Sequence, residues 1–272
     1  MYRVLVPVDG DESRAFDQAK YVARLREATG EVAATVLYVV PPDEFETATD
    51  VAFSDVEGAT DAADYLESEG VSVSRLVDDG SAGAEIVRTA NERDVDEIVM
   101  CGRDRSGVAS VLLGSTVQDV LVAAERPVTV TGERVVFGEG LRHVLLPVDT
   151  NVERARHQAE YVARLRDAGA DLDATVLHVF PHLDYSGAPS HEFSEVDAAV
   201  AAADRLEERG VDVERVAVGG AVARRILAAA DERDVDSVVV GGRKRSGVAA
   251  ALLGSTVRDL LLSATRPVTV TG

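Results

Sequence analysis

The sequence predicts an α/β protein of two tandem domains, each an open five-stranded parallel sheet sandwiched between helices. One observation is a duplication: a shift of 140 positions aligns residues 1–132 with residues 141–272 without a gap. The other is an alternation, within each half, of short valine-rich runs and amphipathic segments. Such an alternation is typical of β-α-β units, whose strands are parallel. We therefore expect domains at 1–132 and 141–272, joined by a linker at 133–140 that is short enough for the halves to dock.

Five runs in the first half have the composition of strands. They lie at residues 4–8, 35–40, 71–77, 97–100 and 128–131, and each recurs in the second half. Because they are rich in valine and little interrupted by polar residues, we expect strands that are buried on both faces.

Amphipathic segments separate these runs. Apolar residues spaced at three or four positions mark one face of each of two predicted helices. The helix before the second strand has Ala15, Ala19, Val22 and Ala23 on this face. The helix before the last strand has Val117, Val120, Leu121 and Ala124. Gly70 and Gly210 follow the second helix of each half, where a left-handed cap is expected.

Composition narrows the class of protein. The chain has 48 acidic and 28 basic residues, a formal charge of −20, two lysines and no tryptophan. This charge disfavours nucleic acid and anionic lipid as partners, and it is typical of proteins from salt-accumulating halophiles. One cysteine excludes a disulfide framework. Without a recognisable signal peptide or an apolar run long enough to span a membrane, we expect a cytoplasmic protein.

Three segments of each half converge on one edge of the predicted sheet, where open α/β sheets bind ligands. The first segment ends strand one at Asp9, or at Asp149 in the second half. The second ends strand four, and the third is a Gly-Ser pair that opens the last helix. The candidate ligand-binding residues in these segments are Asp9, Gly114, Ser115, Pro147, Val148, Asp149, Val240, Gly241, Gly254, Ser255 and Thr256.

The Gly-Ser pair is the strongest of these signals, because backbone N–H groups at a helix N-terminus favour an anion. A structural alternative is that Ser115 and Ser255 cap the helix, with Gln118 completing a capping box. The alternative for Asp9 and Asp149 is that they only end a strand and begin a turn.

At these residues the chain resembles the universal stress protein family in tandem form. The matching motifs are Val-Pro-Val-Asp at strand one, Arg-Ser-Gly after strand four, Leu-Leu-Gly-Ser, and the closing Arg-Pro-Val-Thr-Val, present in both halves. The resemblance implies strand order 3-2-1-4-5 and an adenine nucleotide, ATP with Mg²⁺. It places Val39 and Val179 in the adenine pocket, Asp9 and Asp149 near adenosine or a metal, and Arg103 and Arg243 in the phosphate loop. It also implies pairing of last strands across a two-fold interface, as an internal pseudo-dimer or a homodimer.

The phosphate loop departs from the family pattern, which has Gly, two residues, Gly, nine residues, then Gly followed by Ser or Thr. The first two glycine positions hold Cys101 and Asp104 in the first half, and Gly241 and Lys244 in the second. Asp104 would repel phosphate, whereas Lys244 is a cation that can pair with it. We therefore expect nucleotide binding mainly in the second half.

Other chemistry has weaker support. Asp11 and Glu12 suggest a cation site, but the second half has Asn151 and Val152 there, so we expect no metal site. Cys101 is expected to be a packed side chain. The histidines occur only in the second half without ligand spacing, and two of them, His182 and His191, are expected in a solvated loop.

No nucleophile–base pair recurs in both halves, so we expect no catalytic residues and no enzyme. A Walker-type loop is absent, and the lysine of a phosphoacceptor receiver domain is missing. The leading hypothesis is a regulatory stress-response protein that binds an adenine nucleotide. The alternative is a nucleotide-free, dimerising interaction module.

Overall fold

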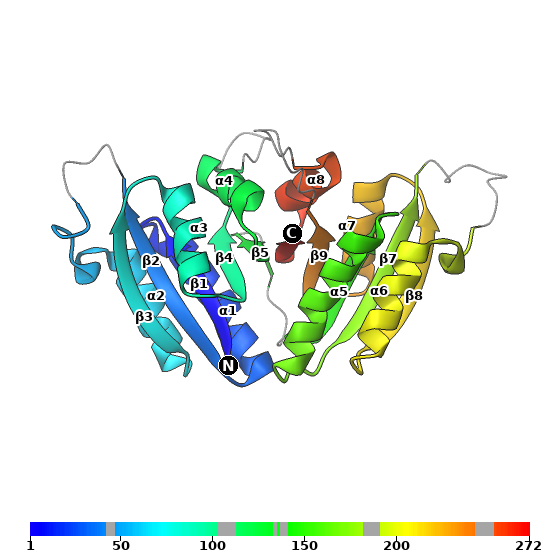
Figure 1. The fold of residues 1–272 in the computed structure, drawn as a ribbon, viewed down its shortest axis with the longest axis horizontal. Coiled ribbons are helices and arrows are strands. Elements are labelled where there is room, and N and C mark those ends of the chain that lie inside the picture. The colour runs from blue at the N-terminus through cyan, green and yellow to red at the C-terminus, as the bar shows by residue number, and fades with distance from the viewer. Residues whose placement is uncertain (42–46, 103–112, 133–134, 137–140, 182–190, 243–252) are drawn as a thin grey trace. The chain divides into compact units, whose positions relative to one another are not determined.

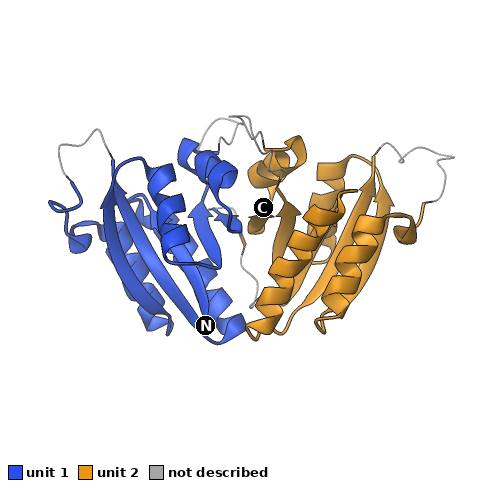
Figure 2. Cartoon of the chain, viewed as in Figure 1, with its two compact units in different colours: residues 1–135 blue, residues 136–272 orange. Residues whose placement is uncertain are grey.

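The computed structural model describes residues 1–41, 47–102, 113–132, 135–136, 141–181, 191–242 and 253–272. The chain divides into two compact units, Met1–Val135 (unit 1) and Val136–Gly272 (unit 2), coloured separately in Figure 2. The predicted sites Arg103, Asp104, Arg243 and Lys244, with His182, lie outside the described residues.

Unit 1 is an open parallel sheet of five strands in the order β3-β2-β1-β4-β5, as Figure 1 shows. The strand order and the α/β class confirm the prediction. Its elements are β1 (Tyr2–Val8), α1 (Glu12–Thr29), β2 (Val32–Val40), the short 3-10 helix η1 (Phe53–Asp55), α2 (Glu57–Ser68), β3 (Ser72–Asp79), α3 (Ala82–Glu92), β4 (Glu97–Cys101), α4 (Ser115–Ala123) and β5 (Val128–Thr131).

Unit 2 repeats this arrangement with the strand order β8-β7-β6-β9-β10. Its elements are β6 (His143–Val148), α5 (Val152–Asp167), β7 (Asp173–Phe180), the 3-10 helix η2 (Phe193–Glu195), α6 (Asp197–Glu207), β8 (Asp212–Gly219), α7 (Val222–Glu232), β9 (Ser237–Gly241), α8 (Ser255–Ser263) and β10 (Val268–Thr271).

Two pairs of helices flank each sheet. In unit 1, α1 packs on α2 and α3 packs on α4; in unit 2, α5 packs on α6 and α7 on α8. Right-handed crossovers place the first pair on one face and the second on the other, because the chain reverses direction across the sheet after its third strand. The reversal separates β1 from β4, and β6 from β9, at their carboxyl ends. This is where a ligand crevice is expected.

The predicted face of α1 is confirmed as core, because Ala15, Ala19, Val22 and Ala23 are all buried. On the predicted face of α4, Val117, Val120 and Ala124 are buried, whereas Leu121 is half-buried. Gly70 and Gly210 have φ of 79° and 73°, the left-handed conformation predicted for helix caps. No helix in the described part of the chain is long and apolar enough to cross a membrane.

The third strand of each unit corrects the expectation of burial on both faces. Most residues of β3 and β8 are exposed or half-buried, whereas the central strands β1 and β4 are almost wholly buried. The physical reason is position, because β3 and β8 pair with one neighbour only and lie at the edge of the sheet. Arg75 and Arg215 on these strands form ion pairs with carboxylates of the neighbouring helices.

Candidate functional site

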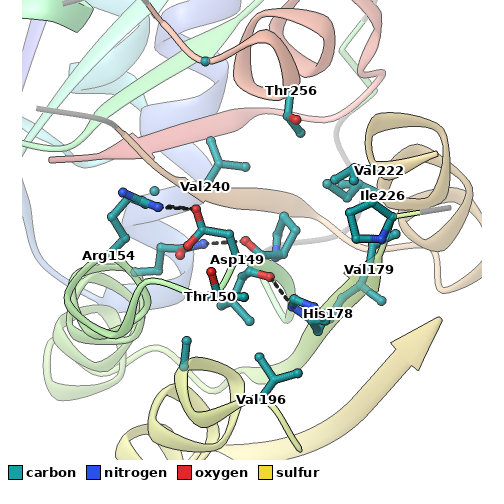
Figure 3. Close-up of a pocket in the computed structure, with 18 of the residues that line it drawn as sticks. Asp149, Thr150, Arg154, His178, Val179, Val196, Val222, Ile226, Val240 and Thr256 are labelled. Carbon is teal, nitrogen blue, oxygen red and sulfur yellow. Dashed lines mark hydrogen bonds and ion pairs between the residues drawn. The ribbon is translucent and has the colours of Figure 1, made fainter. Parts of the chain in front are cut away.

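A cavity of about 620 Å³ lies at the carboxyl ends of the strands in unit 2. Its volume is within the range typical of small-molecule sites. All the predicted candidates of the second half that the structure describes line this cavity: Pro147, Val148, Asp149, Val179, Val240, Gly241, Gly254, Ser255 and Thr256. Figure 3 shows the close-up. Segments separated by more than a hundred positions in the sequence thus meet at one place.

A buried glutamine bridges the two strands that diverge beneath the cavity. Gln158 Nε2 donates to Pro147 O at 2.9 Å and to Val239 O at 2.8 Å, joining β6 to β9. Gln18 does the same in unit 1, with 2.7 Å to Pro7 O and 2.8 Å to Val99 O. Sequence reasoning missed both residues. The available signal was an uncharged polar residue that recurs on the apolar face of the first helix.

Asp149, at the end of β6, is held by an ion pair to Arg154 on α5, drawn in Figure 3. Its other oxygen accepts from Asn151 N at 2.8 Å, and Asn151 Oδ1 accepts from Arg154 N at 2.9 Å, which caps α5. The aspartate therefore orders the turn and also presents its carboxylate to the cavity. Sequence reasoning did not identify Arg154.

The same turn in unit 1 carries more negative charge. Arg14 pairs with Asp9 at 2.9 Å and with Asp11 at 3.1 Å, and Asp11 caps α1 through its bond from Arg14 N. Asp11 is thus a helix cap. Its role in capping explains why an acidic residue stands at this position, which the sequence suggested, with Glu12, as part of a cation site. The described residues contain no group of three or more His, Cys, Asp or Glu side chains that could hold a metal ion.

The N-terminus of α8 opens onto the cavity of unit 2. Gly254 is the N-cap, with φ −57° and ψ 147°, and Ser255 is the first helical residue. The first bond of the helix runs from Arg258 N to Gly254 O, so the N–H groups of Ser255, Thr256 and Val257 have no intrahelical acceptor. These donors, together with the positive end of the helix dipole, favour an anion.

The structural alternative, in which Ser115 and Ser255 cap the last helices, is wrong in both units. Gly114 and Gly254 occupy the N-cap position, and neither has a side chain that could cap. Gln118 does not complete a capping box with Ser115; its Nε2 donates to Leu113 O at 2.7 Å. The reason is that the extended backbone continues through the glycine, which shifts the helix start by one residue. The serine hydroxyls are therefore not required for capping.

Apolar side chains from three elements form one wall of the cavity. Val179 comes from β7, Val240 from β9, and Val222 and Ile226 from α7. Figure 3 shows Val222 and Ile226 beside Val179. Such a wall suits the face of an aromatic base, because burial of a planar apolar surface is favourable without demanding hydrogen bonds.

Two histidines have roles that the sequence did not reveal. His178 is 5% exposed, lines the cavity, and bonds through Nδ1 to Val148 O at 2.9 Å. His191 lies in an exposed loop segment, as expected, and its ring also stacks on Phe180 with ring centroids 4.8 Å apart and bonds to Glu195 at 2.6 Å. The sequence did not reveal these contacts, because Phe180 is eleven positions away.

Unit 1 has a smaller cavity, about 340 Å³, at the corresponding place. The predicted residues Asp9, Val39, Gly114 and Ser115 line it. Two of its lining side chains, Tyr38 and Cys101, are larger than their counterparts His178 and Gly241.

Glycine at 241 has a steric reason. A Cβ added there would lie 3.1 Å from Arg154 Cβ and 3.2 Å from Gln158 Oε1, so a larger residue would displace the side chains that shape the floor of the cavity. Cys101 holds this position in unit 1, half-buried beside Gly102, and burial raises the pKa of its thiol to about 12. A thiol that stays protonated is a poor nucleophile.

The comparisons with known proteins agree with this architecture. The model of the universal stress protein family matches residues 1–132 and 140–272. A universal stress protein from Archaeoglobus fulgidus DSM 4304 is 20% identical with a TM-score of 0.77, covering 99% of this chain and 97% of its own. A functionally unknown protein from Pseudomonas aeruginosa PAO1 is 20% identical with a TM-score of 0.66, covering 100% of this chain and 92% of its own.

A shorter match covers one half only. The universal stress protein from Archaeoglobus fulgidus in complex with dAMP is 22% identical with a TM-score of 0.36, covering 47% of this chain and 95% of its own. No curated protein sequence matches the chain. The structural matches show the fold, and the two matches of the family model cover nearly every residue. The chain therefore belongs to the universal stress protein family, with one family domain in each half.

Proposed function

We propose that this chain is a regulatory protein of the stress response that binds an adenine nucleotide, ATP, in unit 2, with no catalytic cycle of its own. The observation that carries the proposal is the cavity of unit 2. It combines an apolar wall at Val179, Val222 and Ile226 with the N–H donors of α8. A nucleotide has the matching halves, a planar base and an anionic phosphate chain.

The described residues fit such a ligand. The wall at Val179 would take the base, and the α8 N-terminus at Gly254, Ser255 and Thr256 would take phosphate oxygens. Asp149, fixed by Arg154, would accept from the sugar. A Mg²⁺ ion would be carried by the phosphates, since the described carboxylates offer no cluster to hold it.

Unit 1 is proposed to bind nucleotide more weakly than unit 2. Its cavity is narrower, and Cys101 stands where unit 2 has glycine. Its strand-one turn adds Asp11 to Asp9 around a single arginine, which leaves a net negative charge near the site. The smaller cavity is also the observation that favours the alternative function, a nucleotide-free interaction module, for this unit.

The test is a calorimetric titration of ATP at high potassium chloride with three proteins: wild type, Gly241→Cys and Cys101→Gly. Gly241→Cys copies unit 1 into unit 2 and is expected to weaken binding by at least about tenfold, or about 1.4 kcal/mol, because the side chain crowds Arg154 and Gln158 and takes up space in the cavity. Cys101→Gly is the matched control and is expected to leave the wild-type affinity of unit 2 unchanged. Absence of ATP binding by wild type would overturn the proposal in favour of the nucleotide-free module.

A further inference from the structure

The cavity of unit 2 extends beyond the base wall and the α8 N-terminus. Part of its lining comes from the end of β7 and the start of α6: His178, Phe180, Glu195, Val196 and Asp197, which we call the α6 lobe. The corresponding residues at 55–57 of unit 1, all of them described, do not line the cavity of that unit. The extension is therefore particular to the second half of this chain.

Aromatic contacts hold the α6 lobe open. The Phe180 ring packs edge-on against His178, with centroids 4.6 Å apart, and stacks on His191. His191 in turn bonds Glu195 at 2.6 Å, which ties the segment before α6 to the end of β7. Unit 1 has Val40 and Val51 at the positions of Phe180 and His191, so it lacks this ring stack. The lobe is thus preformed by side chains that only unit 2 possesses.

The hydrogen bond of His178 fixes the chemistry of its free nitrogen. Val148 O can only accept, so Nδ1 carries the proton of the 2.9 Å bond. In the neutral ring, Nε2 is then an acceptor, and no residue within the described ranges donates to it. Figure 3 shows this bond at the edge of the cavity. A nearly buried imidazole that lines the cavity therefore offers it an unmatched acceptor.

The rest of the α6 lobe adds acceptors and no side-chain donor. Glu195 and Asp197 contribute carboxylates, while Phe180 and Val196 are apolar. The cation nearest in the cavity, Arg154, is already paired with Asp149. The side chains of this surface are complementary to a ligand group that donates hydrogen bonds.

We propose that the α6 lobe is a subsite for a hydrogen-bond donor of the bound nucleotide, with His178 Nε2 as the specificity-determining acceptor. The donor is the ribose 2′-hydroxyl or the exocyclic amine of adenine; both are neutral groups that an imidazole nitrogen can accept from. The inference rests on the nucleotide site proposed for unit 2. The additional claim is that the site distinguishes nucleosides by a hydrogen bond, as well as binding the phosphates.

The test compares wild type with His178→Asn against three ligands at about pH 8, where a free imidazole is neutral. Asparagine can keep the bond to Val148 O through its amide while removing the acceptor at Nε2. The ligands are ATP, 2′-deoxy-ATP and the triphosphate of purine riboside, which lacks the amine. His157→Asn, at an exposed histidine of the same unit that does not line the cavity, is the matched control, and its affinity for ATP is expected to equal that of wild type.

His178→Asn is expected to weaken ATP on the order of 2- to 12-fold, the value of one neutral hydrogen bond. Wild type is expected to bind one of the two analogues more weakly than ATP, by a similar factor. His178→Asn is expected to bind that analogue with the same affinity as it binds ATP. If His178→Asn lowers the affinity for all three ligands by the same factor, the inference is overturned. Such a result would mean that His178 only shapes the cavity and accepts no hydrogen bond from the ligand.

If the variant does not fold, equal affinity of wild type for ATP and both analogues would overturn the inference by itself. Both results leave the proposed nucleotide site standing, whereas absence of any ATP binding would remove that site and the subsite together.

Discussion

The residues that shape the candidate site are mostly ones whose importance depends on contacts distant in sequence. Gly241 on β9 is closely approached by Arg154 and Gln158 of α5. The strand-one aspartates could be predicted from their position at the end of a strand. Their arginine partners could not, because an arginine on an amphipathic helix is normally a solvated surface residue.

Gln158 gives a prediction at this scale. Gln158→Leu removes a donor from two carbonyls and leaves them buried at the point where β6 and β9 separate. We expect a loss of about 1–3 kcal/mol in the free energy of unfolding of unit 2. Urea unfolding followed by circular dichroism measures it, with the exposed neighbour His157→Leu as control. A loss no larger than that of the control would show that the bridge does not stabilise the sheet.

At the scale of elements, the periodicity of the sequence predicted whether a segment is a strand or a helix. It was less successful in predicting how deeply each element is buried. The strands at 4–8 and 128–131 correspond to β1 and β5 almost residue for residue. Edge position was missed, although β3 has two valines in eight residues and its one neighbour β2 has four in nine, because the predicted run 71–77 begins and ends on valine. The alternative of a serine cap at α4 was wrong because the backbone uses the glycine of the Gly-Ser pair as the N-cap.

Helix capping gives the second prediction. Asn151→Ala removes the side chain that caps α5, and we expect it to cost about 1 kcal/mol of stability. Ser255→Ala should change stability by less than about 0.5 kcal/mol, because Ser255 lies after the cap of α8. Thermal unfolding of the two variants compares them directly. A larger loss for Ser255→Ala than for Asn151→Ala would restore the serine as the cap.

At the scale of the whole molecule, the duplication and the charge were both readable from sequence. The duplication appears as two units with the same strand order, and it turns each unit into an internal control for the other. The differences that matter are few: Cys101 for Gly241, Tyr38 for His178, and Asp11 for Asn151. The sequence aligned these pairs, but only the cavities show that the first two of them line the candidate site of each unit.

The charge of −20 predicts a dependence on salt. Screening shortens the reach of repulsion from about 10 Å at 0.1 M to about 3 Å at 1 M salt. We expect the melting temperature to rise with potassium chloride over this range, because repulsion among surplus carboxylates outweighs the surface ion pairs that salt also weakens. Differential scanning calorimetry follows the transition; a melting temperature that falls with salt would show that the ion pairs dominate.

The central claim is that unit 2 holds the nucleotide, and photolabelling with 8-azido-ATP tests where the base lies. After digestion and mass spectrometry, the account predicts a label that excess ATP suppresses, on the peptides containing Val179 or Ile226. Gly241→Cys should reduce this label, and Cys101→Gly should not. A suppressible label on the peptides containing Val39 or Ile86 would place the base in unit 1 and contradict the account.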